Sequence, residues 1–176
     1  MMRAIFWVTL LTVSLGFSKA AAADAIAWKV DPVHSTAQFT ARHFGIVPVV
    51  GTIPIKSATV DLADGTQIPT AVHADLDPAD LDTHNSMRDG DLRSDHFFGV
   101  ATNPAMSFTS TKITGSDPKN FVIVGNLTMH GQTHEITLKA QCVGQGKSPF
   151  GHQFIAYTAN GTINRSDWGM SYGPII

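Results

Sequence analysis

A two-residue alternation of apolar and polar side chains runs through most of this chain and strongly restricts the folds open to it. It is clearest in two runs, residues 121–129 and 136–142, in which every second residue is apolar or glycine. A turn that contains His130-Gly131 separates the two runs. Such alternation is typical of strands with one buried face, and the turn between the runs predicts an antiparallel hairpin.

The same alternation recurs at short intervals, so one hairpin is expected to follow another. Four further runs show it, residues 36–43, 58–62, 72–76 and 106–111, and residues 153–162 form a last extended run. The run at 46–55 is also apolar, but Pro48 and Pro54 lack the N–H group that a central strand needs, so we expect a bent or edge strand there. Eight or nine short strands predict an all-β fold, an antiparallel barrel or sandwich. We favour a barrel of about eight strands because closure removes exposed edges.

The stretch at 81–98 departs from this pattern, and we expect it to be one short helical insert. It concentrates charge between positions 88 and 95, with two arginines and three aspartates. Because opposite charges are interleaved, we expect Arg88 and Arg93 to pair with neighbouring aspartates on the outer side of the helix. The apolar members would then face the barrel as a plug or lid: Leu92, Phe97 and Phe98.

The first 23 residues have the features of a secretory signal peptide. Arg3 precedes an apolar run at 4–17, and small residues at 20–23 offer a cleavage site after Ala23. The apolar run is shorter than the roughly 20 residues that a membrane-spanning helix needs. We therefore expect export and a mature chain of residues 24–176, which is the size of one domain.

The mature chain is mildly acidic and has one cysteine. Of the 12 lysines and arginines, Arg3 and Lys19 lie in the signal peptide, which leaves 10 against 14 acidic residues. This balance disfavours nucleic acid and anionic membrane surfaces as partners. Cys142 ends the alternating run at 136–142, so we expect it to be a small buried apolar residue rather than a reactive thiol. Without a second cysteine no intrachain disulfide can form, and the hydrophobic core has to hold the fold.

Eight histidines raise the question of a metal site. They are scattered along the chain: His34, His43, His73, His84, His96, His130, His134 and His152. Only His130 and His134 are four residues apart, and Gly131 places them around a hairpin turn rather than on one face of a helix. The residues therefore predict no metal site. A metal-dependent exported enzyme or a metal-responsive stress protein that uses the histidines is the alternative.

Other catalytic arrangements lack the surroundings that they need. Ser35 beside His34 could join Asp31 in a Ser-His-Asp triad, but no nucleophile-elbow pattern surrounds the serine. The aspartates at 89, 91 and 95 lack the closing glutamate of a calcium loop. We therefore predict no catalytic residues and no enzymatic activity.

Several short motifs together resemble one known family. They are Trp28–Ser35, His43-Phe44-Gly45, Leu92-Arg93-Ser94, Gly125–Thr128 and Asn164–Gly169. Their combination resembles the YceI-like family over nearly the whole mature chain. The resemblance implies a lipocalin-like antiparallel β-barrel whose long apolar cavity holds an isoprenoid or a similar lipid. It also implies a periplasmic location in a Gram-negative bacterium, and lipid transport or storage without established catalytic machinery.

The resemblance changes how the inward-facing apolar residues are interpreted. From the alternation alone they could fill a core as well as line a cavity. The resemblance favours a cavity for an isoprenoid or other long-chain amphiphilic lipid, quinone-like or polyprenyl. The expected lining residues are Phe39, Val72, Leu76, Phe97, Phe98, Met106, Phe108, Phe121, Ile123, Leu127, Ile136 and Leu138. Three polar residues are candidates for binding the head group: His34, His43 and Arg88.

The expected ligand is this lipid alone, with no other cofactor and no nucleic acid. A membrane redox protein is a candidate partner, and the sequence leaves the oligomeric state open, a homodimer included. Members of the family continue after the Asn164–Gly169 motif into a final strand, whereas this chain ends at Ile176. We therefore expect an open sheet edge in which that final strand is missing.

Overall fold

Strands make up most of the computed structural model, which describes residues 25–173. Within that range eight strands form: β1 (Ile26–Lys29), β2 (Thr36–His43), β3 (Val47–Leu62), β4 (Pro69–Leu76), β5 (Met106–Asp117), β6 (Asn120–Met129), β7 (Gln132–Lys147) and β8 (Gln153–Asn160). The helices described there are α1 (Ser86–Arg93) and two 3₁₀ helices, η1 (Pro78–Asp80) and η2 (Arg165–Trp168). None of these helices is long and apolar enough to cross a membrane. The predicted signal peptide, residues 1–23, lies outside the described residues.

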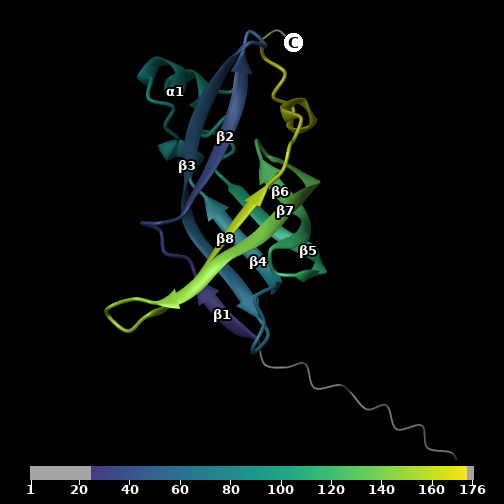
Figure 1. Cartoon of the computed structure of the whole chain (residues 1–176). Coiled ribbons are helices and arrows are strands. Elements are labelled where there is room, and N and C mark those ends of the chain that lie inside the picture. Colours follow the sequence, from purple (N-terminus) through teal and green to yellow (C-terminus); the bar gives the residue numbers. More distant parts are fainter. Residues whose placement is uncertain (1–24, 174–176) are drawn as a thin grey trace, which may run out of the picture.

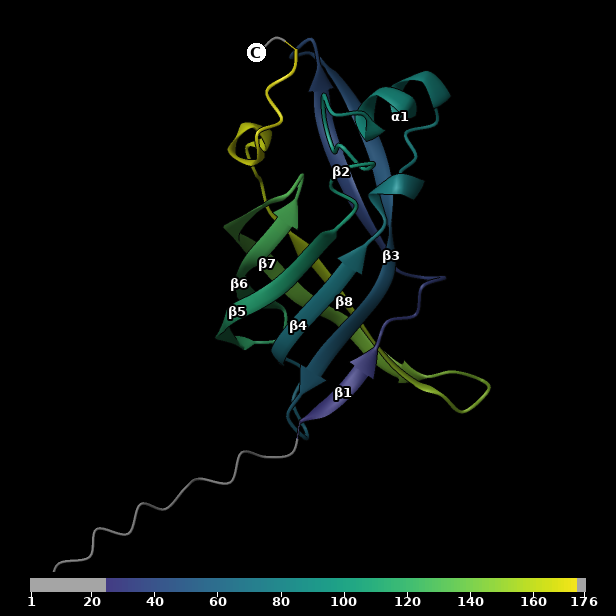
Figure 2. The same cartoon turned by 180° about the vertical axis from the view of Figure 1, so that it is seen from behind.

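The strands form an antiparallel sheet in the order β1-β3-β4-β5-β6-β7-β8, and β2 pairs with the first half of β3. Short turns join β2 to β3, β3 to β4, and the strands from β5 to β8 in succession, whereas η1 and α1 lie in the long connection between β4 and β5. The sheet curls strongly, so that it forms a half-barrel (Figures 1 and 2). The predicted all-β antiparallel fold of about eight strands with one helical segment is confirmed.

The half-barrel has an open side between its outer strands. Within residues 25–173, β2 pairs only with β3 and β8 pairs only with β7. The expected closure of the barrel is therefore not made by the described part of the chain, where no strand lies between β8 and β2. Curling alone, which follows from the twist of adjacent strands, gives the sheet its concave inner face.

β3 is longer than predicted, because two predicted runs join into one strand of 16 residues. In its first half β3 pairs with β2 on one side, and on the other side the amide of Thr52 donates to the carbonyl of Asp82 at 2.9 Å. Pro48 and Pro54 each lie an even number of residues from Thr52, and the N–H groups of alternate residues in a strand point to the same side. The N–H groups that the two prolines lack would therefore point away from β2, as that of Thr52 does. Both prolines are tolerated because no bond of the β2–β3 ladder is lost.

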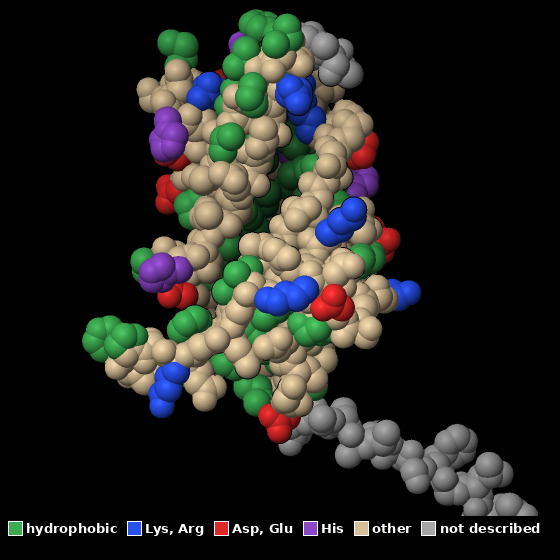
Figure 3. All heavy atoms as spheres, viewed as in Figure 1, with side chains coloured by type: hydrophobic (Ala, Val, Ile, Leu, Met, Phe, Trp, Pro, Cys, Tyr) green, Lys and Arg blue, Asp and Glu red, His purple; other side chains and the backbone are tan. Residues whose placement is uncertain are grey.

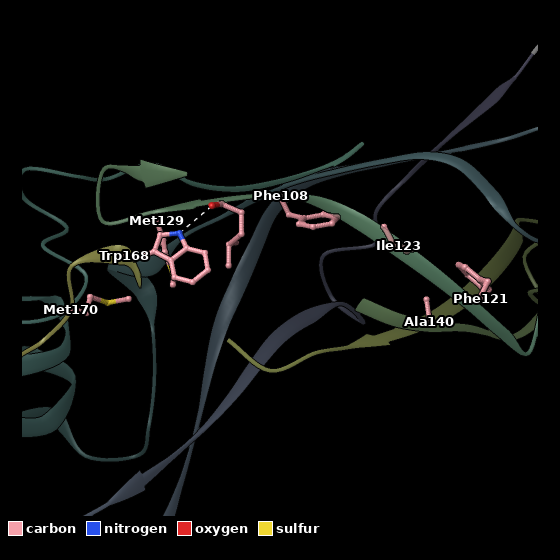
Figure 4. Packing of buried hydrophobic residues seen from close by; sticks show 8 residues of the cluster. Phe108, Phe121, Ile123, Met129, Ala140, Trp168 and Met170 are labelled. Atoms are coloured by element: carbon pink, nitrogen blue, oxygen red, sulfur yellow. Dashed lines mark hydrogen bonds between the residues drawn. The ribbon is translucent and has the colours of Figure 1, made fainter. Parts of the chain in front are cut away.

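The core lies on the concave face of β5, β6 and β7. Its buried members are Phe108, Phe121, Ile123, Leu127, Met129, Ala140, Trp168 and Met170 (Figure 4). Trp168 comes from η2, far along the chain, and its indole N–H donates to the carbonyl of Leu127 at 3.1 Å. Cys142 on β7 is also buried, so its predicted role as a small apolar residue is confirmed.

The helical insert forms where the sequence predicts it, as α1. The side chain of Asn85 caps the helix by accepting a hydrogen bond from the amide of Arg88 at 3.0 Å. Asp89 lies in the first turn and Arg93 in the last turn, where their charges complement the helix dipole. Local capping therefore explains where this helix begins and ends.

The chain after β8 crosses back over the end of the half-barrel as a segment that we call the strap, residues 164–173 (yellow in Figure 1). Asn164 caps η2 by accepting a hydrogen bond from the backbone amide of Ser166 at 3.3 Å. Trp168 inserts into the core, whereas the ring of Tyr172 stacks on His96, just after α1, with 3.9 Å between centroids. The strap thus joins the β6–β7 side of the molecule to the α1 side.

Candidate ligand-binding groove

A groove runs along the open side of the half-barrel, between β2 and the strands β6 to β8. Figure 3 shows it as a hollow with hydrophobic side chains on its floor. Several apolar residues pack against the core cluster but remain only partly buried: Ile68, Val72, Phe98, Met106, Ile113, Ile136, Leu138 and Tyr157. Accessible apolar surface on a concave face is what a hydrocarbon ligand requires.

The structure brings nine of the twelve predicted lining residues into or against the core cluster. Four of the nine are buried: Phe108, Phe121, Ile123 and Leu127. Five are partly buried and pack against them: Val72, Phe98, Met106, Ile136 and Leu138. The alternation therefore identifies the inner face of the sheet. Burial divides these residues into a core set and a set that leaves apolar surface accessible.

The other three predicted lining residues have different surroundings. Phe39 lies on β2, and its ring meets Phe98 edge-on with 6.4 Å between centroids. Leu76 is half-buried at the end of β4. Phe97 contacts the strap, where its ring lies edge-on to Tyr172 with centroids 5.9 Å apart. Of the two phenylalanines that close the insert, Phe98 thus packs on the core, whereas Phe97 supports the strap.

Two glycines let aromatic rings approach the sheet closely at the wall and floor of the groove. A Cβ atom at Gly51 of β3 would overlap the ring of Phe39. A Cβ atom at Gly125 of β6 would overlap the ring of Phe108 in the same way. Glycine in a strand often marks such a close approach, and here each glycine fixes the place of one ring.

The predicted head-group residues do not gather at one site. His34 lies before β2, where its exposed Nδ1 is 2.8 Å from a carboxylate oxygen of Asp31. His43 ends β2, and its ring packs on Phe44 with centroids 4.0 Å apart. β2 separates the two histidines, and its eight residues span roughly 25 Å at ~3.3 Å per residue. Both lie at strand ends, where alternation says nothing about which side chains meet, so the structure does not support a shared head-group site.

Arg88, the third head-group candidate, is engaged within the insert. Its Nε donates to the hydroxyl oxygen of Thr83 at 2.7 Å, and its Nη2 donates to the carbonyl of Thr83 at 2.7 Å. The buried carboxylate of Asp89 accepts from the amide of Thr83 at 2.9 Å and from its hydroxyl at 2.5 Å. The hydrogen bond from the Thr83 hydroxyl is the main reason that the pKa of Asp89 is lowered. We call these three residues the Thr83 latch.

The expected pairing of arginines with neighbouring aspartates does not occur in the described insert. Arg93 donates its Nε to the carbonyl of Ala79 at 2.7 Å and its Nη2 to the carbonyl of Leu81 at 2.9 Å. Both arginines therefore bind carbonyl groups of the segment that precedes α1. Leu81 and Thr83 are buried, and buried carbonyls outside a sheet ladder need donors, whereas exposed aspartates are solvated by water. The partners of the two arginines are therefore set by these carbonyl groups and not by the pattern of charges along the helix.

His130 and His134 both contact Trp168. Nδ1 of His130 lies 2.7 Å from the carbonyl oxygen of Trp168, and the ring of His134 meets the indole edge-on at 4.9 Å. The two histidines brace the strap against β6 and β7. Within residues 25–173, no group of three or more His, Cys, Asp or Glu side chains is placed so that it could hold a metal ion.

The strap completes the core, which was not predicted from the sequence. Trp168 and Met170 are buried in the core cluster, and Arg165 lies over the ring of Phe97 at 5.3 Å. The available signal was the Asn164–Gly169 motif. Alternation could not place these side chains because the strap is not a strand.

Two depressions lie at the end of the sheet away from α1. The larger, of about 420 Å³, is formed by the β3–β4 and β5–β6 turns and includes Ile68 and Pro118. The smaller, of about 300 Å³, lies between β1 and β8 and includes Trp28 and Ile155. Neither contains any of the twelve predicted lining residues. Neither depression is therefore the cavity that the sequence predicts.

Comparison with known proteins agrees with this architecture. The YceI-like domain matches residues 28–175. The chain belongs to the YceI-like domain family. A UPF0312 protein of Staphylococcus epidermidis is 34% identical to this YceI-like chain over 149 residues, which cover 83% of this chain and 83% of that protein. A UPF0312 protein of Serratia proteamaculans is 30% identical over 167 residues, which cover 93% of this chain and 86% of that protein.

Solved structures share the fold of this YceI-like chain. The crystal structure of the Campylobacter jejuni YceI protein has a TM-score of 0.64 at 30% sequence identity, and the match covers 80% of this chain and 82% of that chain. Burkholderia cenocepacia BcnA has a TM-score of 0.59 at 20% identity, with 66% and 73% covered. The second likeness concerns the fold alone.

Proposed function

We propose that this YceI-like protein binds an isoprenoid or other long-chain amphiphilic lipid, quinone-like or polyprenyl, in the groove of the half-barrel. The observation that carries the proposal is the concave apolar face that remains accessible there (Figure 3). Val72, Met106, Ile136 and Leu138 pack on the core cluster of this face but are only partly buried. Membership of a family with a barrel-like fold supports the same conclusion.

A hydrocarbon tail suits this surface because burial of apolar area needs no directional contact. Covering ~200 Å² of apolar surface at ~25 cal/mol per Å² contributes about 5 kcal/mol. Because no polar contact measures the length of the tail, the groove would discriminate weakly between chains of different length. The proposed role is noncovalent binding, storage or transport, without catalysis and without a further cofactor.

The proposed location is the periplasm, with the predicted signal peptide as its basis. In an aqueous compartment a free polyprenyl or quinone tail would be exposed to water. A carrier with an apolar groove lowers the free-energy cost of exposing the tail to water while the lipid moves between membranes or to a membrane redox protein.

Native mass spectrometry of protein purified from the periplasm, followed by organic extraction, tests the proposal. We expect an adduct that is released as a hydrophobic lipid. Phe39→Ser, on the groove wall, should reduce lipid retention. Phe150→Ser is the matched control, because Phe150 is 88% exposed between β7 and β8, away from the groove. Protein that carries no lipid and takes up none from solution would contradict the proposal.

A further inference from the structure

Arg165 differs from the other arginines of the described chain, because part of its guanidinium is enclosed but has no hydrogen-bond partner. Its Nη2 donates to the carbonyl oxygen of Tyr172 at 2.7 Å. Its Nη1 is buried and finds no acceptor among residues 25–173. No carboxylate of those residues lies within 4.0 Å of it. Arg88 and Arg93, in contrast, each direct two donors to oxygen atoms of the segment that precedes α1.

An enclosed guanidinium N–H group without an acceptor is costly, because it has lost water and gained nothing in exchange. A chain can keep such a group where another molecule supplies the acceptor. The group would then form a charge-assisted hydrogen bond, which is shorter and stronger than one between neutral groups.

The surroundings of Arg165 hold the guanidinium in place and restrict access by water. Its central carbon lies 5.3 Å from the ring centroid of Phe97, in a cation–π arrangement. The ring of Tyr172 lies edge-on to Phe97 and stacks on His96. His96 is itself 3.4 Å from Asp91, so this aspartate already has a partner. Low local dielectric strengthens the attraction of a fixed cation for an anion.

Arg165 also lies at the end of the groove. It belongs to the strap, whose Trp168 and Met170 are buried in the core cluster. Phe97, which contacts Arg165, precedes Phe98, and Phe98 contacts Phe39 of the groove wall. Arg165 therefore lies against one of two consecutive phenylalanines, and the other one contacts the wall of the groove.

We propose that Arg165 is the polar anchor of the ligand, and that its Nη1 donates to an oxyanion, a phosphate or a carboxylate, on the head group of a lipid whose tail lies in the groove. This inference rests on the proposed function and specifies the chemistry of the head group. Tyr172 is the movable cover of the site. It is 51% exposed, and its backbone is held to Arg165 by one hydrogen bond, so a local shift of the strap would admit the head group.

Farnesyl phosphate and farnesol test the anchor because they share one tail and differ in the head group. Isothermal titration calorimetry should show that the wild-type protein binds farnesyl phosphate about ten- to hundredfold more tightly than farnesol, as expected for one charge-assisted contact. Arg165→Met keeps the length of the side chain without its charge and should bind both probes alike. Arg42→Met is the matched control and should keep the preference, because Arg42 is exposed on β2.

Arg165→Lys provides a second test in case Arg165→Met does not fold. This variant keeps the positive charge but has a single donor nitrogen. Its preference for farnesyl phosphate over farnesol should therefore lie between that of the wild type and that of Arg165→Met. Equal binding of both probes by the wild type, or an unchanged preference in folded Arg165→Met, would overturn the anchor while the groove stands. Failure of the wild type to bind either probe would instead overturn the proposed function.

Discussion

The two walls of the groove are built differently. On β6, Phe121 is 1% exposed and lies edge-on to Tyr157 of β8, whereas Met129 is 2% exposed beside Trp168 of the strap (Figure 4). On β2, Phe39 is half-buried, and the turn that follows exposes Phe44 and Ile46. β2 has one strand partner, whereas β6 has two.

This difference separates stability from binding within one sheet. The β5–β7 side carries the buried core and so holds the half-barrel together, although Met106, Ile136 and Leu138 on that side stay only partly buried. The β2 side leaves apolar surface accessible, which contributes little to folding but can be covered by a ligand. The two sides should therefore respond to mutation in opposite ways.

The largest loss of stability is expected for Phe121→Ala on β6. Removal of a fully buried ring leaves a cavity that neighbouring strands fill only in part, so the free energy of unfolding should fall by about 3–5 kcal/mol. Urea denaturation followed by circular dichroism measures the change. A loss of less than ~1 kcal/mol would mean that β6 is not the stable side.

A smaller loss is expected when the Thr83 latch is broken. Thr83→Val removes the hydroxyl that donates to buried Asp89 and accepts from Arg88, so stability should fall by about 2 kcal/mol. Asp91→Asn is the control, because Asp91 is half-exposed and should change stability by less than ~0.5 kcal/mol. The same urea titration compares the two variants, and equal effects would remove the latch from the account of stability.

The latch should also make stability depend on pH. The pKa of Asp89 is lower in the folded protein than its ordinary value, mainly because of the Thr83 hydroxyl. Its stabilising effect is therefore fully present above the unfolded pKa of about 4 and is lost as the pH falls through the lower folded value. Unfolding curves between pH 6 and pH 2 should fall less steeply for Asp89→Asn than for the wild type. Parallel curves would show that another group dominates acid unfolding.

The smallest effect on stability, but a large effect on binding, is expected for Phe39→Ala. Its half-buried ring should contribute only about 1 kcal/mol to folding. Affinity for farnesol, measured by calorimetry, should fall about tenfold, because the groove wall loses its main aromatic contact. Phe121→Ala and Phe39→Ala thus test opposite sides of the comparison. If Phe39→Ala lost stability but kept its affinity, β2 would belong to the core.

Much of the fold could be predicted because alternation is a local property. The inward parity of Phe108, Phe121, Ile123 and Leu127 follows from the two-residue period of a strand, and all four are buried. The helix at 86–93 was expected because the alternation stops there. The long β3 was not expected, because proline usually breaks a strand. Pro48 and Pro54 are tolerated only because the N–H groups that they lack would point away from β2, and the sequence does not show on which side β2 pairs.

The candidate site was less predictable, because it depends on segments that meet only after folding. His34 and His43 appeared suitable for a head group, yet they lie at opposite ends of β2 and bind neighbours there. Arg165 stood within a recognisable motif, but nothing in the sequence placed its guanidinium against Phe97, 68 positions earlier.

The sequence by itself determined that this chain forms an antiparallel sheet, which side chains face inward, and where the helix interrupts it. These properties depend on the backbone period and on local capping, which a few neighbouring residues decide. Only the tertiary structure decided that Arg88 and Arg93 bind carbonyl groups and that the strap brings Arg165 against Phe97. Those outcomes depend on which unpaired groups meet in space, and residues far apart in the chain supply them.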